Sequence, residues 1–350
     1  MTLRFPSELR PTRILTPEGW VRQVSELRRD PLTGRSGRVA HFAGFQLVAP
    51  RFEAEVAASR PNCPFCPERL ERVTPRLPPR LFAEGRLRRG EATLFPNLSP
   101  YDRHSVVISL TREHMVELDG FSQRQLADGL RVAIDYFRAL APGPRGSHSL
   151  LTWNYMPPAG ATQVHPHLQA FLTDRPGWLL EEEVRRSRAF LRRRGTPYWL
   201  ELVECERGLG SRFIAQGERT TWLTAYVSRS VVSDVLVVFP RAARLEDLDQ
   251  ETIEEWCVGL RVALGALHAE GIRAFNLGFF GAPDREKGGD HWRLHARLCP
   301  RIYFNPLLRG SDSTSWQHLL DEPFMVRSPE SLAAGLRPHF RGRLPPPSQS

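Results

Sequence analysis

The chain has 350 residues, 41% of them hydrophobic and 25% charged, which is typical of a soluble globular protein with one large or two ordinary domains. Its net charge is +9, and every basic residue except Lys287 is an arginine, the side chain that binds phosphate in a bidentate fork. The chain has no dense basic run with interleaved aromatic residues, the pattern that would favour nucleic acid as a partner. No uninterrupted apolar run approaches the roughly 18 residues of a membrane span.

Cysteine usage and the first residues of the chain indicate the compartment. The five cysteines are an odd number, and only Cys63 and Cys66 are closely spaced, which predicts a reducing compartment and no structural disulfide. Residues 1–6 contain no apolar signal core. We therefore expect a cytoplasmic protein.

The N-terminal region, residues 1–40, is rich in arginine and is expected to be irregular, with a turn at Asp30–Gly34. A short strand is expected at Phe45–Ala49. The next motif, Cys63-Pro-Phe-Cys66, is either a redox pair or half of a metal site. Because prolines follow it where a redox pair would open a helix, half of a zinc site is favoured, and such a site needs two more ligands.

The middle of the chain predicts strands that alternate with a helix. A buried strand at 106–110 precedes His114, and an amphipathic helix is expected from Ser122 to Leu140. Strands are then expected at Ser149–Tyr155 and, after a turn rich in glycine and proline, at Gln163–Phe171.

The second of these strands carries His165, His167 and Gln169. Residues two apart on a strand point to the same face, so two imidazoles and an amide are expected on one surface. Imidazole can act as a metal ligand, a base or a nucleophile near neutral pH, and an amide can bind an oxygen of the group that is attacked.

The same order of elements recurs in the second half of the chain. Strands are expected at Val235–Val238, Phe275–Phe279 and Trp292–Leu298, and a helix at Asp247–His268. Ile108 and Val238 are 130 residues apart, as are His165 and His295, which predicts a duplicated unit. In that register Arg297 stands where His167 does, so a single nucleophilic site is expected, in the first half. The alternative is a pair of unrelated segments with similar spacing.

These motifs together resemble the galactose-1-phosphate uridylyltransferase branch of the histidine triad superfamily, whose members consist of two tandem histidine-triad-like repeats. The matching motifs are Asp30–Gly34, Cys63-Pro-Phe-Cys66, Phe95-Pro96, Arg112-Glu113-His114, Asn154, His165-Pro-His-Leu-Gln169, Gly281-Ala-Pro283 and His291-Trp-Arg-Leu-His-Ala296. The resemblance implies an α+β fold in which each repeat is an antiparallel sheet with a packed helix, the two repeats forming one compact unit. The N-terminal repeat would span residues 1–175, and the degenerate C-terminal repeat residues 176–350.

The resemblance also implies roles for individual residues. One structural zinc per chain would be bound by Cys63, Cys66, His114 and His165. His167 would be the nucleophile that forms a covalent nucleotidyl-imidazole, and Gln169 would bind the phosphoryl oxygens. The substrate would be contacted by Phe95, Asn154, Gly160, Thr162, Arg51 and Arg60.

The chain departs from the family pattern in three places. Thr93-Leu94 stands where the family has an Asn-Asp pair that holds the ribose. Only Glu183 and His295 remain of the four ligands of a second metal site, whose other places are taken by Phe280 and Arg297, so that metal is expected to be absent. The family's elements that read the hexose phosphate are not found between Ser311 and Pro329.

Three functions remain open. The first is transfer of a nucleoside monophosphate from a nucleotide sugar to a sugar-1-phosphate, with ping-pong kinetics. The second is a phosphorylase that uses inorganic phosphate, as the family's ADP-glucose and dinucleoside polyphosphate phosphorylases do. The third is a zinc-stabilised nucleotide-binding module without turnover, which the intact His167 and Gln169 disfavour. Because glutamine cannot do acid–base work, Gln169 favours transfer over hydrolysis. We expect a cytoplasmic homodimer of carbohydrate metabolism that acts on a nucleotide sugar and a phosphorylated acceptor.

Overall fold

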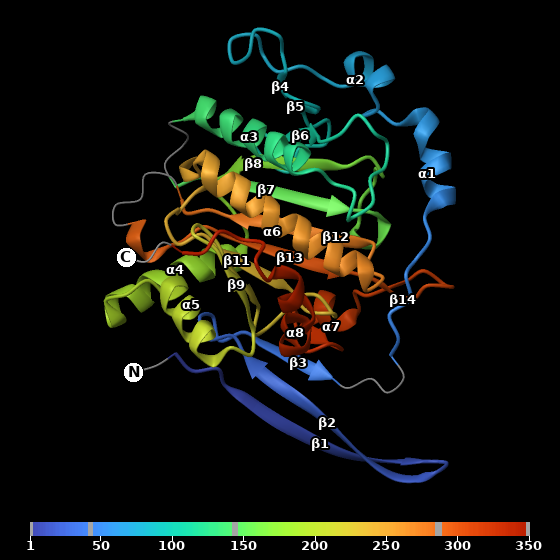
Figure 1. Ribbon diagram of the computed structural model, residues 1–350, viewed down its shortest axis with the longest axis vertical. Helices are drawn as coiled ribbons and strands as arrows, with labels where there is room; N and C mark the ends of the chain where they lie inside the picture. The colour runs from blue at the N-terminus through green and yellow to red at the C-terminus, as the bar shows by residue number, and fades with distance from the viewer. Residues whose placement is uncertain (1–2, 41–44, 142–145, 284–288, 348–350) are drawn as a thin grey trace.

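The structure is a computed structural model that describes residues 3–40, 45–141, 146–283 and 289–347. A ten-stranded antiparallel sheet runs through the centre of the molecule (Figure 1). In spatial order its strands are β4 (Leu87–Arg89), β5 (Ala92–Pro96), β6 (Val106–Ser109), β8 (His167–Thr173), β7 (His148–Tyr155), β12 (Ala274–Phe280), β13 (His295–Arg301), β11 (Val235–Val238), β10 (Thr221–Thr224) and β9 (Phe213–Gln216).

The sheet consists of two halves with the same internal order. Five strands from the first half of the chain run from β4 to β7, and five from the second half run from β12 to β9. The two halves meet where β7 pairs with β12, with Asn154 opposite Asn276. The α+β fold of two tandem repeats is therefore confirmed, whereas the boundary between residues 175 and 176 stays a prediction.

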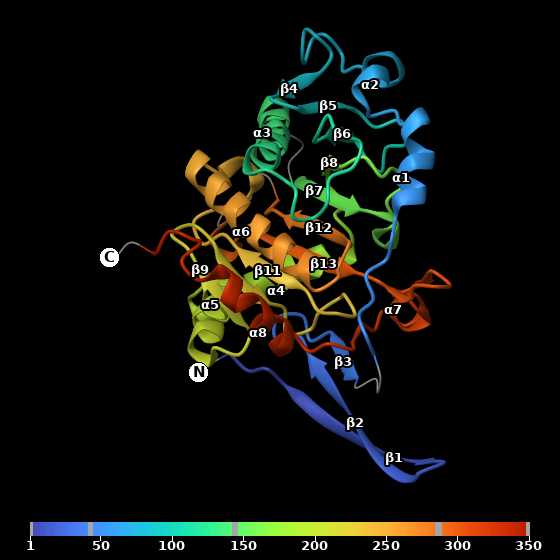
Figure 2. The same ribbon diagram turned by 45° about the vertical axis from the view of Figure 1, so that its right-hand side comes forward.

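One long helix from each repeat covers the same face of the sheet. These are α3 (Gln123–Leu140) and α6 (Gln250–Ala269), which lie side by side across the sheet (Figures 1 and 2). Each begins at a residue whose side chain accepts a backbone hydrogen bond: Ser122 from Gln125, and Asp249 from Thr252. Both helices occur where the spacing of apolar residues predicts them.

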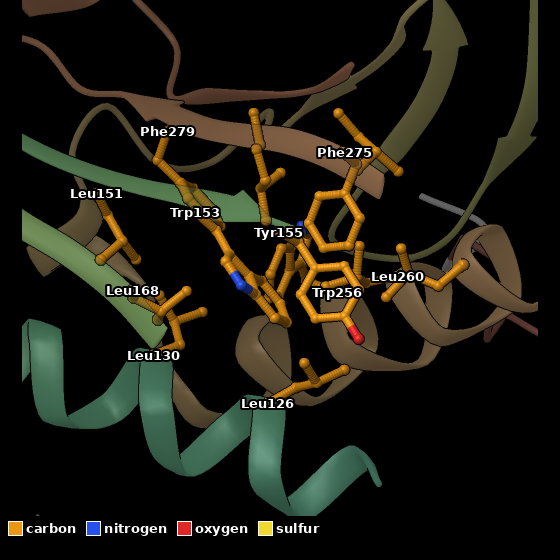
Figure 3. Close-up of a cluster of buried hydrophobic side chains, with 14 of the residues drawn as sticks. Leu126, Leu130, Leu151, Trp153, Tyr155, Leu168, Trp256, Leu260, Phe275 and Phe279 are labelled. Atoms are coloured by element: carbon orange, nitrogen blue, oxygen red, sulfur yellow. The ribbon is translucent and has the colours of Figure 1, made fainter. Parts of the chain in front are cut away.

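Figure 3 shows the core between these helices and the strands. Leu126 and Leu130 from α3 and Trp256 from α6 approach Trp153 of β7 and Phe275 of β12, and all five are buried. The rings of Trp153 and Phe275, from different repeats, are 4.9 Å apart. The core therefore joins the two repeats into one compact unit.

The opposite face of the sheet is covered differently in the two halves. Over the second repeat lie α4 (Trp178–Arg194) and α5 (Tyr198–Leu209), whose Val184 and Trp199 pack with Leu236 of β11. Over the first repeat lies the segment that contains the Cys-x-x-Cys motif. There, Leu70 of α2 (Pro67–Val73), the short helix after the motif, packs with Phe95 of β5 and Val107 of β6.

The N-terminal region is more regular than its sequence predicts. β1 (Ser7–Thr16) and β2 (Gly19–Arg29) form a long ribbon that extends from the body of the molecule (Figure 1), joined by β3 (Ser36–Ala40) and β16 (Phe324–Met325). The prediction of irregular structure was wrong because β1 is exposed on both faces, so it lacks the alternation of apolar and polar residues that marks a half-buried strand. The strand expected at Phe45–Ala49 is wrong as well, because that segment pairs with no other strand in the described structure.

The remaining elements are short. They are α1 (Glu53–Ser59), α2 (Pro67–Val73), α7 (Ser315–Leu319), α8 (Pro329–Phe340), β14 (Tyr303–Asn305), β15 (Gly310–Ser311) and the 3-10 helices Arg60–Asn62, Pro157–Ala159, Leu245–Asp247 and Gly289–His291. Across the described ranges, every helix is too short or too polar to cross a membrane.

Candidate active site and metal centre

Four predicted metal ligands come together in the first repeat. The ligand atoms of Cys63, Cys66, His114 and His165 all lie within 4.8 Å of one another, and all four residues are buried. The Cys66 Sγ atom is 3.4 Å from His114 Nδ1 and 3.6 Å from His165 Nδ1. A regular tetrahedral zinc site, with Zn–S near 2.3 Å and Zn–N near 2.0 Å, has S···N edges of about 3.5 Å, so these donors are spaced as that site requires.

The other ring nitrogen of each histidine is held by the protein. His165 Nε2–H donates to the Thr111 carbonyl at 2.8 Å, and His114 Nε2–H donates to Ser59 Oγ at 3.0 Å. Each bond fixes the tautomer that leaves the Nδ1 lone pair facing the thiols, which is how histidine ligands are oriented at metal sites. Neither Ser59 nor Thr111 could be found from sequence motifs, because serine, threonine and backbone carbonyls carry no spacing signal.

Burial determines the protonation of these groups in the absence of a cation. It lowers the pKa of His165 to about 4, so this imidazole is neutral and able to ligate. Burial, with the neighbouring Cys63, raises the pKa of Cys66 to about 12. Two buried thiols become thiolates only beside a cation, so two cysteines and two histidines fit a divalent metal bound in a closed site.

His167 is the first residue of β8, next to the metal cluster. Its Nδ1–H donates to the backbone carbonyl of His165 at 2.8 Å, so Nε2 carries the lone pair. Burial lowers the pKa of His167, which keeps the ring neutral. His167 Nε2 therefore has an available lone pair, and the backbone carbonyl of the candidate ligand His165 sets the orientation of the ring.

One detail of the predicted strand is wrong. β8 begins at His167 and not at Gln163, so His165 lies in the segment that leads into the strand. Pro166 has no N–H for a ladder bond, although its carbonyl still accepts from Leu110 N at 3.0 Å. His167 and Gln169 share one face as predicted, whereas His165 is directed into the metal cluster.

Aromatic side chains line one side of His167. Phe65, from between the two cysteines, lies 5.1 Å from the His167 ring and 5.5 Å from the Phe95 ring, measured between centroids. Phe95 itself is buried beneath Phe65 in a small cluster with Leu70 and Val107. Phe65, a residue that the sequence motifs did not single out, thus lies between Phe95 and His167.

Asn154 lies on the neighbouring strand, and its amide is held by the second repeat. Asn276 Nδ2 donates to Asn154 Oδ1 at 2.7 Å and to the Ala159 carbonyl at 2.9 Å, and Arg301 Nη1 donates to Asn276 Oδ1 at 2.7 Å. Because its oxygen is used in this way, Asn154 is left with its NH₂ group as a donor. Arg301 is in turn fixed by Asp312.

The remaining candidates are less closely placed. Gly160 follows the 3-10 helix Pro157–Ala159 with a φ of 78°, a left-handed conformation that glycine adopts without strain, and Thr162 is exposed in the same loop. Arg60 is exposed but close enough to Cys66 to lower its pKa, against the larger effect of burial. Arg51 is exposed before α1, and among the described residues it makes no hydrogen bond or ion pair with the other candidates.

The strand ladders correct the predicted register of the duplication. His167 pairs with Ser109 at the start of β8, and His295 pairs with Val238 at the start of β13. His295 Nδ1–H also donates to the carbonyl two residues earlier, at 3.2 Å, as His167 does. His295, and not Arg297, therefore stands in the place of His167. Equal sequence separations of 130 were misleading because the loops of the two repeats differ slightly in length.

The second repeat has kept this histidine but covered it. Trp199 of α5 stacks on His295 with 3.8 Å between ring centroids, and Phe280 stacks at 5.2 Å. The nearest oxygen of the buried Glu183 is 3.9 Å from His295 Nε2, and Arg297 forms an ion pair with Asp234. The single nucleophilic site and the absence of a second metal both stay predictions, and the aromatic cover over His295 agrees with the first.

Comparisons with known proteins identify the fold. No protein-family model matches the chain. It is 29% identical over 304 residues to an uncharacterized protein of Archaeoglobus fulgidus, covering 86% of this chain and 88% of the other.

Three solved structures are similar over almost their whole length. A GalT-like protein and an ADP-glucose phosphorylase with bound ADP-glucose, both from Arabidopsis thaliana, have TM-scores of 0.69 and 0.70 at 15% identity, covering 89% of this chain and 98% of each. A uridylyltransferase mutant has a TM-score of 0.65 at 18% identity, covering 90% of this chain and 97% of its own. The chain therefore shares its fold with these proteins.

Proposed function

We propose that the protein is a nucleotidyltransferase that moves a nucleoside monophosphate from a nucleotide sugar to a phosphorylated acceptor through a covalent adduct on His167. The observation that carries this proposal is the hydrogen bond from His167 Nδ1–H to the His165 carbonyl, at 2.8 Å. It fixes the tautomer with Nε2 as nucleophile, and it places an acceptor beside the positive charge that the ring gains when Nε2 is bonded to phosphorus.

The reaction would proceed in two displacements at one phosphorus atom. In the first, His167 Nε2 forms a bond to phosphorus while the bond from phosphorus to the sugar-phosphate oxygen breaks, and the sugar phosphate leaves with the electron pair. In the second, a phosphate oxygen of the acceptor forms the new bond, and the bond to Nε2 breaks. The imidazole keeps its Nδ1 proton throughout, so no general base is needed.

The neighbouring residues would bind and orient the substrate. Asn154 would donate its NH₂ group to a substrate oxygen, and Gln169, on the same face of β8 as His167, would bind the phosphoryl group. The backbone near Gly160 and Thr162, the ring of Phe95 beneath Phe65, and Arg51 and Arg60 would complete the site. A single zinc, held by Cys63, Cys66, His114 and His165, would immobilise the segment that leads into His167.

The second candidate, a phosphorylase with inorganic phosphate as acceptor, uses the same nucleophile. The missing hexose-reading elements between Ser311 and Pro329 bear on the acceptor, since inorganic phosphate, unlike a sugar-1-phosphate, carries no sugar to be recognised. A solved structure of similar fold is an ADP-glucose phosphorylase with its substrate bound. With either acceptor, we propose that the protein is cytoplasmic and forms a homodimer.

The test is to incubate the protein with a panel of isotopically labelled nucleotide sugars and to measure its intact mass. We expect a gain of one nucleoside monophosphate per chain with at least one donor, and its loss when sugar-1-phosphate or inorganic phosphate is added. The acceptor that removes the label distinguishes the two candidates. His167→Gly should abolish the gain, whereas His318→Gly, which changes an exposed histidine of α7, should retain it.

A further inference from the structure

A pocket lined by arginine lies on the second repeat, away from His167. It has a volume of about 680 Å³, and its wall contains Arg4, Arg29, Arg186, Arg193, Arg194 and Asp30 beside the apolar residues Leu3, Pro6, Pro31, Leu32 and Phe190. Five of its twelve lining residues are arginines, about three times the share of arginine in the whole chain (47 of 350). The arginine content of the chain alone therefore does not account for this cluster.

Three of these guanidinium groups have no carboxylate partner. Arg186 pairs with Glu182 and Arg194 with Glu201. Within the described ranges, Arg4, Arg29 and Arg193 form no ion pair. Unpaired like charges around one pocket repel each other, and an anion that enters the pocket relieves this repulsion.

The one carboxylate in the wall offsets only one of the arginine charges, and within the described residues it forms no ion pair with any of them. Asp30 Oδ1 accepts from Leu32 N at 3.1 Å, Thr33 N at 2.7 Å and Thr33 Oγ1 at 2.8 Å, so it closes the Asp30–Gly34 turn on itself. This turn also lines a smaller cavity, with Glu183 and Arg297. The two cavities share Asp30, Pro31 and Leu32, so the pocket adjoins the buried side chains of the second repeat.

The walls of the pocket are anchored. The ring of Phe5 packs 5.1 Å from Tyr226, whose hydroxyl donates to the carbonyls of Phe5 and Pro6. Arg29 N donates to the Pro6 carbonyl at 3.0 Å, which holds the N-terminal segment against β2. On the other side, Arg186, Phe190 and Arg193 recur at helical spacing and so share one face of α4. The blue trace leading into β1 passes beside α5 in Figures 1 and 2.

We propose that this pocket is a second ligand site, which binds a small phosphorylated molecule with a ring, of the nucleotide class. Guanidinium groups would contact the phosphate oxygens in bidentate fashion, and the apolar residues Leu3, Pro6 and Pro31 of the wall would contact the ring. The site does not depend on chemistry at His167, because no residue of the candidate active site lines it.

Titration calorimetry with ADP tests this inference. We expect the double variant Arg29→Gln/Arg193→Gln to bind one ADP fewer per chain than the unaltered protein, or to bind it roughly tenfold or more weakly at that site. The control is Arg192→Gln, an exposed arginine of α4 about 100° around the helix from Arg193, which should leave both stoichiometry and affinity unchanged.

The outcomes separate this inference from the proposed function. If the double variant is poorly folded, the single variant Arg193→Gln, which changes an exposed side chain, replaces it in the calorimetry. Equal ADP stoichiometry and affinity in the unaltered protein and these variants would overturn the second site, whatever happens at His167. Nucleotidylation of His167, measured separately by mass, should be retained in the pocket variants. A failure of the proposed function would appear in that second measurement alone.

Discussion

At the scale of single residues, the candidate site depends on groups that fix the orientation of others. The carbonyl of His165 sets the tautomer of His167, and Asn276 sets the orientation of the Asn154 amide. His167 was predictable from its motif. Asn276 was not, because it comes from the other repeat and meets Asn154 only through the pairing of β7 with β12.

Removing Asn276 tests this orientation. In Asn276→Ala the oxygen of Asn154 loses its donor, so the amide can rotate and its NH₂ group no longer points reliably at the substrate. We expect kcat/KM for the donor to fall about three- to tenfold, the value of one ordinary hydrogen bond. Asn305→Ala, at an exposed asparagine of β14, is the control, and an equal kcat/KM in the two variants would contradict the role of Asn276.

Gln169 offers a second test at this scale. An imidazole at this position, on the same face as the nucleophile, can activate water and protonate a leaving group, which an amide cannot do. Gln169→His should therefore raise hydrolysis of the nucleotidyl adduct relative to transfer. The ratio of free nucleoside monophosphate to transferred product measures this change, with Gln46→His, at an exposed position, as the control. An unchanged ratio would show that Gln169 does not determine the fate of the adduct.

At the scale of elements, the Cys63–Cys66 segment is the clearest structural unit of the site. It joins the 3-10 helix Arg60–Asn62 to α2, with Cys63 at the end of the first and Cys66 at the start of the second. The sequence could predict half of this site from the cysteine spacing. The two histidines were assigned only by family resemblance, because they lie 48 and 99 residues beyond Cys66 and no local pattern connects them.

Loss of one ligand should affect folding before chemistry. A structural zinc contributes on the order of 10 kcal/mol, which is comparable with the whole stability of a typical domain. We expect Cys63→Ser to lose the metal, measured by elemental analysis, and to lose most soluble protein. Cys205→Ser, at a partly exposed cysteine of α5, should keep both. A zinc-free preparation of unaltered protein with a normal melting curve would contradict a structural role.

Other elements show where sequence patterns are informative. The α3 and α6 helices were predictable because the sequence of each contains apolar residues at helical spacing and a capping residue before its first turn. The β1–β2 ribbon was not, because exposed strands carry no alternation. The register of the repeats was predicted wrongly because equal sequence separation does not determine which residues correspond. The strand ladders show that His295 corresponds to His167.

At the scale of the whole molecule, the two repeats divide their tasks across one continuous sheet. The first repeat contains His167, the proposed nucleophile, and the four candidate metal ligands, and the second supplies core, the Asn276 contact and a buried histidine. The likeness of strand order shows duplication, whereas the aromatic cover over His295 shows that the two copies differ in the surroundings of this histidine.

This buried histidine should affect the stability of the whole molecule at low pH. Burial lowers the pKa of His295 to about 3, below the ordinary value near 6.5 that it regains on unfolding. The unfolded chain therefore binds this proton first, and stability is lost as pH falls from about 6.5 towards 3. The contribution of this one group is at most about 1.4 kcal/mol per pH unit.

Denaturant unfolding between pH 7 and pH 4 measures this contribution. His295→Gln cannot bind the proton, so its free energy of unfolding should fall less steeply with acid than that of the unaltered protein. The exposed His339 supplies the control variant, His339→Gln, whose slope should match the unaltered protein. Parallel slopes for His295→Gln and the unaltered protein would contradict the burial of a neutral imidazole at this position.

The central claim is that His167 becomes covalently nucleotidylated, and peptide mapping after rapid quenching tests it most directly. The protein is mixed with a labelled donor identified by intact mass, quenched at alkaline pH to preserve the phosphorus–nitrogen bond, and digested. The account predicts one modified peptide, with the nucleoside monophosphate on His167, which disappears when the acceptor is added before quenching. A label on another residue, or turnover by sequential kinetics with no adduct under any active donor, would contradict it.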